Sequence, residues 1–321
     1  MNEPLVSILI PTYNRKKSLE RLLESIYQST YKHIETIIVD DASSDGTFEH
    51  VKKYFHNQNL QIIRNKKNLF AAGSRNVGIK MTSGKYILFI DDDNAIDKKM
   101  IMELVNVIEG DNTIGEVGPV NYSYLQKKKI LWARTKRNMT TTMTNQSRRL
   151  EDFEKLGSWE TDDIPNCYMV RSKILKKEGV FFDTRYGIMY EESDLAYSIK
   201  KLGYRIVVVR NAKIYHDAEK KSENGKTSDY LYHFMVDSRR PFVFARNRLI
   251  FHSRYSSKLQ LFLIHFFWVW FFSVYYLYKI MFYKGYGDFS FYRRIYLSSK
   301  YLYGTYVGLL ISLNLKSYEN L

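Results

Sequence analysis

The sequence contains one cysteine, Cys167, among 321 residues. A single thiol cannot form an internal disulfide or supply the ligands of a cysteine-based zinc site, so both are excluded. Proline is also scarce, with 5 residues, and there is no proline-rich linker. The first 11 residues lack a basic segment followed by a long apolar core. We therefore expect no cleavable signal peptide, and expect the N-terminal domain to lie in a reducing cytosol.

Acidic residues are fewer than basic ones, with 34 Asp and Glu against 49 Lys and Arg. The imbalance is concentrated late in the chain, where residues 210–321 hold 17 basic and 7 acidic residues. Residues 230–321 also hold 28 of the 50 aromatic residues. Because 45% of the chain is hydrophobic and 26% is charged, wholesale disorder is excluded. A basic, aromatic segment is compatible with nucleic acid or an anionic membrane surface.

The first 209 residues alternate short strands with amphipathic helices. Strands are predicted at residues 6–10, 36–39, 60–63, 86–90, 166–171 and 206–209, with the first ended by Pro11. Helices are predicted at residues 18–27, 46–55, 71–81 and 191–201, and residues 114–149 are expected to be less regular. This alternation indicates a parallel sheet covered on both faces. Ligand-binding groups are then expected at the carboxyl ends of the strands.

Residues 259–278 form a run of twenty residues without a formal charge, ten of them aromatic. As a helix the run would be about 30 Å long, which is enough to cross a bilayer core. Basic residues flank it on both sides, so charge does not specify an orientation. A second apolar segment, residues 295–313, is interrupted by Lys300. The pair is compatible with membrane-spanning helices, helices lying in the interface, or a buried helical subdomain of a soluble protein.

Three adjacent carboxylates, Asp91, Asp92 and Asp93, follow the predicted strand at residues 86–90. Adjacent carboxylates repel one another and need a cation or exposure to solvent to stay ionised. Oxygen ligands of this kind suit Mg²⁺ or Mn²⁺, which also bind phosphates. The alternative is a solvated acidic turn that caps the next helix.

Six segments, in this order along the chain, resemble motifs of the GT-A-fold, family 2 glycosyltransferases. They are ILIPTYNR (residues 8–15), VDDASSDGT (39–47), NLFAAGSRNVG (68–78), FIDDD (89–93), YEESDL (190–195) and AKIYH (212–216). The resemblance covers roughly residues 4–220 and implies a GT-A domain, which is a Rossmann-like α/β fold that binds nucleotide-diphosphate sugars. We therefore predict a catalytic domain at residues 1–228, with a nucleotide-sugar-binding half (1–97) and an acceptor half (98–228). A basic, aromatic, helical, membrane-associated region is predicted at residues 229–321.

The resemblance also implies a role for each matching residue. The implied donor-binding residues are Pro11, Thr12, Tyr13, Asn14, Asp41, Asn68, Arg75, Asp91 and Asp92. Within this set, Asp41 would accept a hydrogen bond from the base, and Arg75 would lie near the diphosphate. Asp93 would hold the Mg²⁺ or Mn²⁺ ion. Asp91 would contact the ribose or the metal, and His216 would approach the diphosphate or the metal from the other side. A bound metal ion together with Arg75 suits the chemistry, because a diphosphate leaving group gains negative charge as the glycosidic bond breaks.

An inverting transfer also needs a base that takes the proton of the acceptor hydroxyl. Glu191, Glu192 and Asp194 are the candidates, and successive helix residues point about 100° apart, so Glu191 and Glu192 cannot both face one hydroxyl. By position Glu192 matches the base of the family, which is Asp in many members. The alternative is that these acids only stabilise the N-terminus of a helix.

The sequence departs from the family pattern at two further places. Phe70 replaces the glycine that is usual in the third motif, which would alter how this loop passes the donor. Arg246 and Arg248 precede the apolar run without the Gln-x-x-Arg-Trp motif of processive synthases, which favours addition of a single sugar. These two arginines would bind a donor or lipid phosphate, or merely flank the membrane.

Together these features predict a metal-dependent inverting glycosyltransferase, membrane-associated, with its catalytic domain on the cytoplasmic face. It would move one sugar from a nucleotide-diphosphate sugar to a membrane-presented acceptor, such as a lipid-linked saccharide, at an anionic membrane surface. A polyprenyl-phosphate monosaccharide synthase and a non-catalytic nucleotide-sugar-binding protein are the alternatives. Nucleic acid is not expected as a partner, because the aromatic residues of 259–278 are not interleaved with cations.

Overall fold

The computed structural model describes residues 3–55, 59–153, 157–217, 230–284 and 289–314. The chain folds as two compact units. Unit 1 comprises Met1–Lys136, Asn145–Gly187 and Glu191–Ala218, and unit 2 comprises Arg137–Thr144, Ile188–Tyr190 and Glu219–Leu321. The predicted domain boundary after residue 228 lies outside the described residues.

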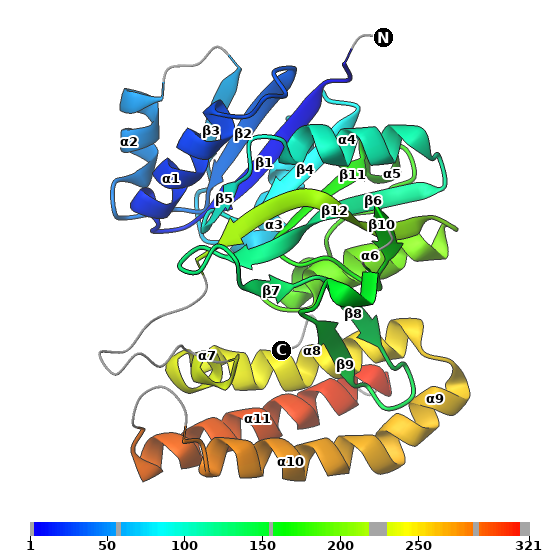
Figure 1. The fold of residues 1–321 in the computed structure, drawn as a ribbon. Coiled ribbons are helices and arrows are strands. Elements are labelled where there is room, and N and C mark those ends of the chain that lie inside the picture. Colours follow the sequence, from blue (N-terminus) through cyan, green and yellow to red (C-terminus); the bar gives the residue numbers. More distant parts are fainter. Residues whose placement is uncertain (1–2, 56–58, 154–156, 218–229, 285–288, 315–321) are drawn as a thin grey trace. The chain divides into compact units, whose positions relative to one another are not determined.

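Unit 1 is built on a ten-stranded sheet (Figure 1). The main path of strands runs in the order β10-β12-β6-β11-β4-β1-β2-β3, while β5 pairs with β12 and β7 pairs with β6. The strands are β1 Val6–Thr12, β2 Ile34–Asp40, β3 Leu60–Arg64, β4 Tyr86–Ile90, β5 Asn94–Ile96, β6 Ile114–Ser123, β7 Ile130–Trp132, β10 Ser158–Glu160, β11 Cys167–Arg171 and β12 Arg205–His216. A separate two-stranded sheet pairs β8 Arg134–Arg137 with β9 Thr144–Ser147.

The sheet is mixed, so the expectation of a parallel sheet is correct only for part of it. Strands β4, β1, β2 and β3 run parallel, as the alternation of strands and helices predicts. Strand β11 then lies between β4 and β6 and runs antiparallel to both. The start of β11 therefore lies at the same edge of the sheet as the carboxyl end of β4.

Two strands differ from their predicted form. Strand β1 continues through Pro11 to Thr12, because its pairing with β4 ends at Leu9 and only β2 lies beside Pro11, where the missing N–H is tolerated. Strand β6 replaces the irregular structure expected from residue 114, and all ten of its residues are buried. Its Gly118 is required by packing, since a Cβ there would lie 2.5 Å from Ile164 Cγ2 and 2.9 Å from the Cys167 carbonyl oxygen.

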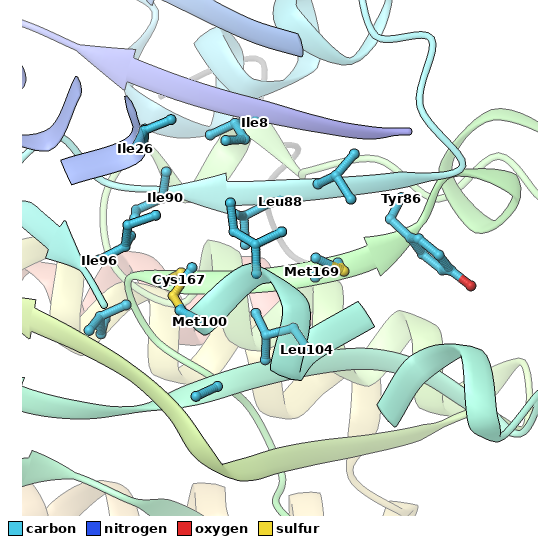
Figure 2. Close-up of a cluster of buried hydrophobic side chains, with 14 of the residues drawn as sticks. Ile8, Ile26, Tyr86, Leu88, Ile90, Ile96, Met100, Leu104, Cys167 and Met169 are labelled. Atoms are coloured by element: carbon cyan, nitrogen blue, oxygen red, sulfur yellow. The ribbon is translucent and has the colours of Figure 1, made fainter. Parts of the chain in front are cut away.

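Helices cover both faces of the sheet, as predicted. The helices of unit 1 are α1 Lys16–Tyr27, α2 Thr47–Tyr54, α3 Phe70–Ile79, α4 Met100–Gly110, α5 Ser172–Lys176 and α6 Glu191–Lys201. Alternate strand residues enter different cores: Ile8 packs with α1 and α4, and Leu9 packs with α3, α5 and α6. Figure 2 shows the first core, to which Met100 of α4 and Cys167 of β11 both belong. Cys167 is a free, buried cysteine, and burial raises the pKa of its thiol.

The described part of unit 2 is largely helical (Figure 1). Its helices are α7 Tyr230–Val236, α8 Arg239–Tyr255, α9 Lys258–Leu263, the π-helical turn η3 Ile264–Trp268, α10 Val269–Met281 and α11 Phe291–Ser312. Elements α9, η3 and α10 form one continuous helix, Lys258–Met281, of 24 residues. It is the one helix in the described chain long and apolar enough to cross a membrane.

Helix α11 packs closely against α8. At Gly304 a Cβ would lie 2.2 Å from the carbonyl oxygen of Phe242, and at Gly308 a Cβ would lie 3.0 Å from the Cα of Arg246. The two glycines therefore allow the backbones of α8 and α11 to approach each other. Two short segments that precede residue 228 also belong to unit 2, and Asn247 of α8 donates hydrogen bonds to the carbonyl oxygens of Ile188 and Met189, each at 2.9 Å.

Candidate active site

Three of the predicted site segments meet at the carboxyl edge of β1 and β4. Thr12, at the end of β1, donates a hydrogen bond of 2.7 Å to Asp92 Oδ2. Arg15, which follows β1, places its Nη1 3.0 Å from Asp92 Oδ1 and 2.6 Å from Asp93 Oδ2. Burial raises the pKa of Asp92 to about 7, although Arg15 acts in the opposite direction. Asp93 is partly buried, with a side chain 21% exposed, and His216 and Arg15 hold the pKa of its carboxyl below the usual range.

The predicted metal ligands are only partly brought together. His216, at the end of β12, has its Nε2 3.4 Å from Asp93 Oδ1, and its Nδ1 lies 3.3 Å from Asn166 Nδ2. Asp91 instead forms an ion pair with Arg75. Among the residues that the structure describes, no group of three or more His, Cys, Asp or Glu forms a ready metal site. Asp93 and His216 still fit Mg²⁺ or Mn²⁺, which commonly take one or two protein ligands and complete their shell with phosphate and water.

Arg75 lies at the centre of the acidic residues. The side chain extends from α3 and is 1% exposed. Its Nη2 lies 2.6 Å from Asp91 Oδ1 and 3.1 Å from Glu192 Oε1, and its Nη1 lies 3.8 Å from Glu191 Oε1. The guanidinium carbon is also 5.2 Å from the centre of the Phe182 ring. One buried cation therefore joins a predicted donor-site carboxylate to two of the three base candidates.

The three base candidates have different surroundings at the N-terminus of α6. Glu192 is largely buried, and its Oε1 accepts hydrogen bonds from Arg75 and from the backbone N–H of Asn166, the latter at 3.2 Å. Burial raises the pKa of Glu192 well above its usual value, although the charge of Arg75 opposes this. Asp194 is 1% exposed and accepts a hydrogen bond of 3.0 Å from the hydroxyl of Tyr186. Asp194 is therefore directed into the protein interior, whereas Glu191 and Glu192 share the Arg75 guanidinium.

The predicted nucleotide-binding loops are held by short hydrogen bonds. Asn14 has a left-handed backbone (φ 54°), donates its N–H to Ser43 Oγ at 2.9 Å, and accepts from the N–H of Ser44 at 2.7 Å. Asp41 Oδ1 accepts from Asn65 Nδ2 and from the N–H of Leu69, both at 2.8 Å. Asp41 thereby ties the end of β2 to the loop that precedes α3.

The loop before α3 carries the first departure from the family pattern. Asn68 Oδ1 accepts from the N–H of Phe70 at 3.0 Å. Phe70 has a φ of 59°, in the left-handed region where glycine is favoured, which is a physical reason for the usual glycine at this position. Its ring is 41% exposed, and Tyr13 is 47% exposed. Both aromatic side chains are therefore accessible to a ligand.

Sequence reasoning missed Asn166 and the bridging role of Arg15. Asn166 precedes β11, has a φ of 68°, and contacts both Glu192 and His216. Its position follows from the antiparallel direction of β11, for which the sequence has no local signal. Arg15 is within the first motif, but its pairing with the two carboxylates depends on the loop conformation around Asn14.

Arg246 and Arg248 lie on α8 in unit 2. Arg246 is partly buried, and its Nε donates to Asn247 Oδ1 at 2.9 Å. Arg248 is 3% exposed and donates to the Tyr301 hydroxyl at 3.1 Å, with its guanidinium 4.8 Å from the Phe272 ring centre. Within unit 2, Arg248 is thus enclosed by aromatic side chains. The predicted phosphate-binding role of the two arginines stays a prediction.

Comparison with known proteins identifies the family. Residues 7–179, which are more than half of the chain, match the family model described as glycosyl transferase family 2. The chain belongs to this family. The predicted family and GT-A fold class are thereby confirmed.

Among curated relatives of this family 2 chain, the amylovoran biosynthesis glycosyltransferase AmsB of Erwinia amylovora is 24% identical over 260 residues, which cover 77% of the chain and 81% of AmsB. The Escherichia coli UDP-Glc:α-D-GlcNAc-diphosphoundecaprenol β-1,3-glucosyltransferase WfaP is 41% identical over 90 residues, covering 28% of the chain and 36% of WfaP. Two uncharacterized glycosyltransferases of Haemophilus influenzae match over 35% and 38% of their own length. The chain thus spans little more than a third of these two relatives.

Solved structures support the same fold. The mannosyltransferase PcManGT from Pyrobaculum calidifontis, in complex with GDP-Man and Mn²⁺, matches with a TM-score of 0.59 and 18% identity. The match covers 98% of this chain and 87% of PcManGT. At this level of identity the likeness establishes the fold alone.

Proposed function

We propose that this family 2 glycosyltransferase moves one sugar, with inversion, from a nucleotide-diphosphate sugar to a hydroxyl of a lipid-linked saccharide. The observation that carries the proposal is the Asp91–Arg75–Glu192 contact. It joins a carboxylate of the predicted donor site to a largely buried carboxylate that is suited to act as a base.

The donor is proposed to bind at the carboxyl edge of β1, β2 and β4. The proposed donor-binding residues are Pro11, Thr12, Tyr13, Asn14, Asp41, Asn68, Asp91 and Asp92. Asp93 and His216, with Asp91 as a further candidate, would hold Mg²⁺ or Mn²⁺, and the ion would stabilise the charge of the departing diphosphate. The separation of 3.4 Å between Asp93 and His216 and the charge of Asp93 support this assignment.

Glu192 is proposed to remove the proton of the acceptor hydroxyl. The acceptor oxygen forms a bond to the anomeric carbon as the bond from that carbon to the diphosphate oxygen breaks, and the proton passes to Glu192. Burial favours the protonated form of Glu192, so the carboxylate accepts a proton more readily than an exposed one. The charge of Arg75 opposes this effect, and its Nη2 donates a hydrogen bond that fixes the direction of Glu192 Oε1. Arg75 is therefore proposed as a positioning residue rather than a ligand of the diphosphate.

A lipid-linked acceptor at a membrane surface is proposed from two observations. WfaP, a relative over part of the chain, is named for a diphosphoundecaprenol acceptor. Residues 210–321 are basic and aromatic, which suits an anionic membrane surface. Membrane attachment would raise the local concentration of such an acceptor at the enzyme.

The test is a matrix of donors and acceptors with the purified full chain. Nucleotide sugars of uridine, guanosine and thymidine are each incubated with Mn²⁺ and either a polyprenyl-diphosphate-linked sugar or a bare polyprenyl phosphate. Transfer to the lipid-linked sugar is expected. Transfer only to the bare phosphate would indicate a polyprenyl-phosphate monosaccharide synthase, and donor binding without any transfer would indicate a binding protein.

Metal dependence is tested separately in the same assay. Removal of divalent ions with EDTA, or the change Asp93→Ala, is expected to abolish transfer, and Mn²⁺ or Mg²⁺ should restore the activity of the EDTA-treated enzyme but not of the variant. Near-normal, metal-dependent transfer by Asp93→Ala would contradict the role of Asp93.

A further inference from the structure

One surface of unit 2 is apolar and exposed in the part of the chain that the structure describes. Between Leu259 and Phe282, ten large hydrophobic side chains are between 42% and 70% exposed. They are Leu259, Phe262, Phe266, Phe267, Trp270, Phe271, Val274, Tyr275, Tyr278 and Phe282. We name this set the outer stripe. So large a group of exposed aromatic residues on one helix marks an interaction surface.

The outer stripe runs along one side of the continuous helix. Its members recur every four residues from Phe262 to Phe282. In a regular α-helix each step of four residues rotates the side chain by about 40°, so such a stripe would wind around the axis. The wider π-helical turn η3, Ile264–Trp268, offsets part of that rotation. The exposed residues are thereby kept closer to a single face.

The opposite side of this helix is packed within unit 2. Ile264 and Val269 lie in a core with Leu249 of α8, and Ile280 lies in a core with Tyr301 of α11. Polar contacts add to this packing: His265 Nε2 lies 2.8 Å from Ser312 Oγ. The helix is therefore two-sided, with a packed inner face and an uncovered aromatic outer face.

The helices that pack beside the helix Lys258–Met281 are poorly suited to the bilayer interior. Helix α11 packs against both α8 and α10, and it carries Lys300 near its middle (Figure 1). Helix α8 is 17 residues long and contains five arginines, with Arg248 near its middle. If α10 crossed the membrane with its packing intact, it would draw these mid-helix cations toward the bilayer centre, where charge is costly.

The positive charges at the two ends of the outer stripe favour binding of the stripe in the headgroup region of a membrane. Lys258 precedes the stripe and Lys284 follows it, and both are exposed. Among the described residues 258–284, no acidic side chain accompanies them. Aromatic residues bordered by lysines are typical of helices that lie at the surface of an anionic membrane.

We propose that the outer stripe docks in the plane of an anionic phospholipid surface, with the helix Lys258–Met281 parallel to that surface and not across it. The proposal decides between the spanning and interfacial alternatives that the sequence leaves open. It does not depend on the proposed transferase reaction, because lipid binding needs neither donor nor acceptor.

Binding is tested by vesicle flotation of the full chain without substrates. Vesicles of phosphatidylcholine with phosphatidylglycerol are compared with vesicles of phosphatidylcholine alone, and the anionic vesicles should bind more protein, less so at high salt. The double variant Phe266→Ser, Trp270→Ser should lower the ratio of bound to free protein at least about tenfold, because two exposed rings leave the lipid. The matched control is Tyr54→Ser, Phe181→Ser, whose parent side chains are 60% and 45% exposed in unit 1, and it should change the ratio less than twofold.

Unchanged binding by the Phe266→Ser, Trp270→Ser variant would overturn the proposal. Light scattering of the protein without vesicles tests whether a second copy of the chain, and not lipid, binds the outer stripe. A dimer that this variant dissociates, together with no binding to anionic vesicles, would assign the stripe to a second copy of the chain and overturn the membrane assignment.

Orientation is tested by cysteine labelling in membrane vesicles from expressing cells. Lys258→Cys and Lys284→Cys are treated separately with a membrane-impermeant maleimide, before and after detergent. Docking in the plane predicts the same labelling state at both positions before detergent. Opposite states at the two positions would show that the helix crosses the bilayer and would overturn the proposal.

Discussion

At the residue scale, the site is organised around a buried cation with an excess of acidic neighbours. Arg75 contacts Asp91, Glu191 and Glu192 while it is 1% exposed. Burying a guanidinium is costly unless several charged partners surround it. The three carboxylates supply those partners, and in return the guanidinium fixes the direction of two of them. The orientation of the proposed base Glu192 thus depends on its contact with Arg75.

The change Arg75→Lys tests this positioning role. A lysine ammonium cannot present the planar fork that contacts Asp91 and Glu192 together. We expect kcat to fall about 100-fold, while the Kd of the nucleotide changes only a few-fold. Kinetics and calorimetric titration with the free nucleotide separate the two effects.

The control for Arg75→Lys is Arg185→Lys, which alters a half-exposed arginine paired with Asp183. It should leave both kcat and nucleotide binding near their original values. A loss of nucleotide binding by Arg75→Lys that matches its loss of kcat would instead support direct contact of Arg75 with the diphosphate.

The burial of a second residue, His252, predicts that the free energy of unfolding depends on pH. His252 of α8 is 1% exposed, and burial, with Arg137 and Arg248 nearby, lowers its pKa to about 3. In the unfolded chain its pKa is about 6.5. Between these values the unfolded state binds a proton and the folded state does not. The free energy of unfolding therefore falls as the pH decreases from about 6.5 toward 3, by up to about 1.4 kcal/mol per pH unit.

The variant His252→Asn removes this titration. Denaturant unfolding of both proteins at pH 7 and pH 5 should show a smaller loss of stability in the variant. Equal losses in the two proteins would mean that His252 is already accessible to protons in the folded state.

At the scale of elements, the local sequence pattern predicts the strands and helices that alternate regularly but not those set by distant pairing. Strands β1 to β4 and helix α6 have clear periodicity, and their positions were predictable. Strand β6 was not, because Gly115, Gly118 and Pro119 obscure its pattern. The position of Asn166 depends on β11 running antiparallel to β4, and the position of Arg248 depends on Tyr301 in another helix. Both follow from long-range packing.

The close packing of α8 and α11 at Gly304 can be tested by a substitution. The change Gly304→Ala would bring a Cβ to 2.2 Å from the carbonyl oxygen of Phe242, and backbone cannot move aside as a flexible side chain can. We expect a loss of about 1–3 kcal/mol in the stability of unit 2. Urea unfolding followed by the fluorescence of the tryptophans in residues 268–270 measures this loss.

Gly110→Ala is the matched control, since a Cβ there meets nothing within 4 Å and the residue ends helix α4. This change should alter stability by less than about 1 kcal/mol. Equal effects of the two substitutions would contradict the close packing of α8 and α11.

At the scale of the whole molecule, the net charge of +15 resolves into two parts with different roles. The acidic clusters of unit 1 include the proposed metal and base residues. The basic and aromatic surplus lies mainly in residues 210–321, where a membrane surface is the proposed partner. The family motifs made the acidic clusters of unit 1 predictable from the sequence. The outer stripe became visible only when packing distinguished buried from exposed aromatic residues.

Glu192 is proposed as the base of the glycosyl transfer, and the change Glu192→Gln removes that function alone. Glutamine keeps the size of the side chain but cannot take the acceptor proton. Transfer and nucleotide binding are measured for Glu192→Gln and for Glu191→Gln side by side. We predict that Glu192→Gln lowers kcat about 10²–10⁴-fold with the nucleotide Kd nearly unchanged, while Glu191→Gln keeps most of its activity. Full activity of Glu192→Gln together with an inactive Glu191→Gln would contradict the assignment of Glu192 as the base.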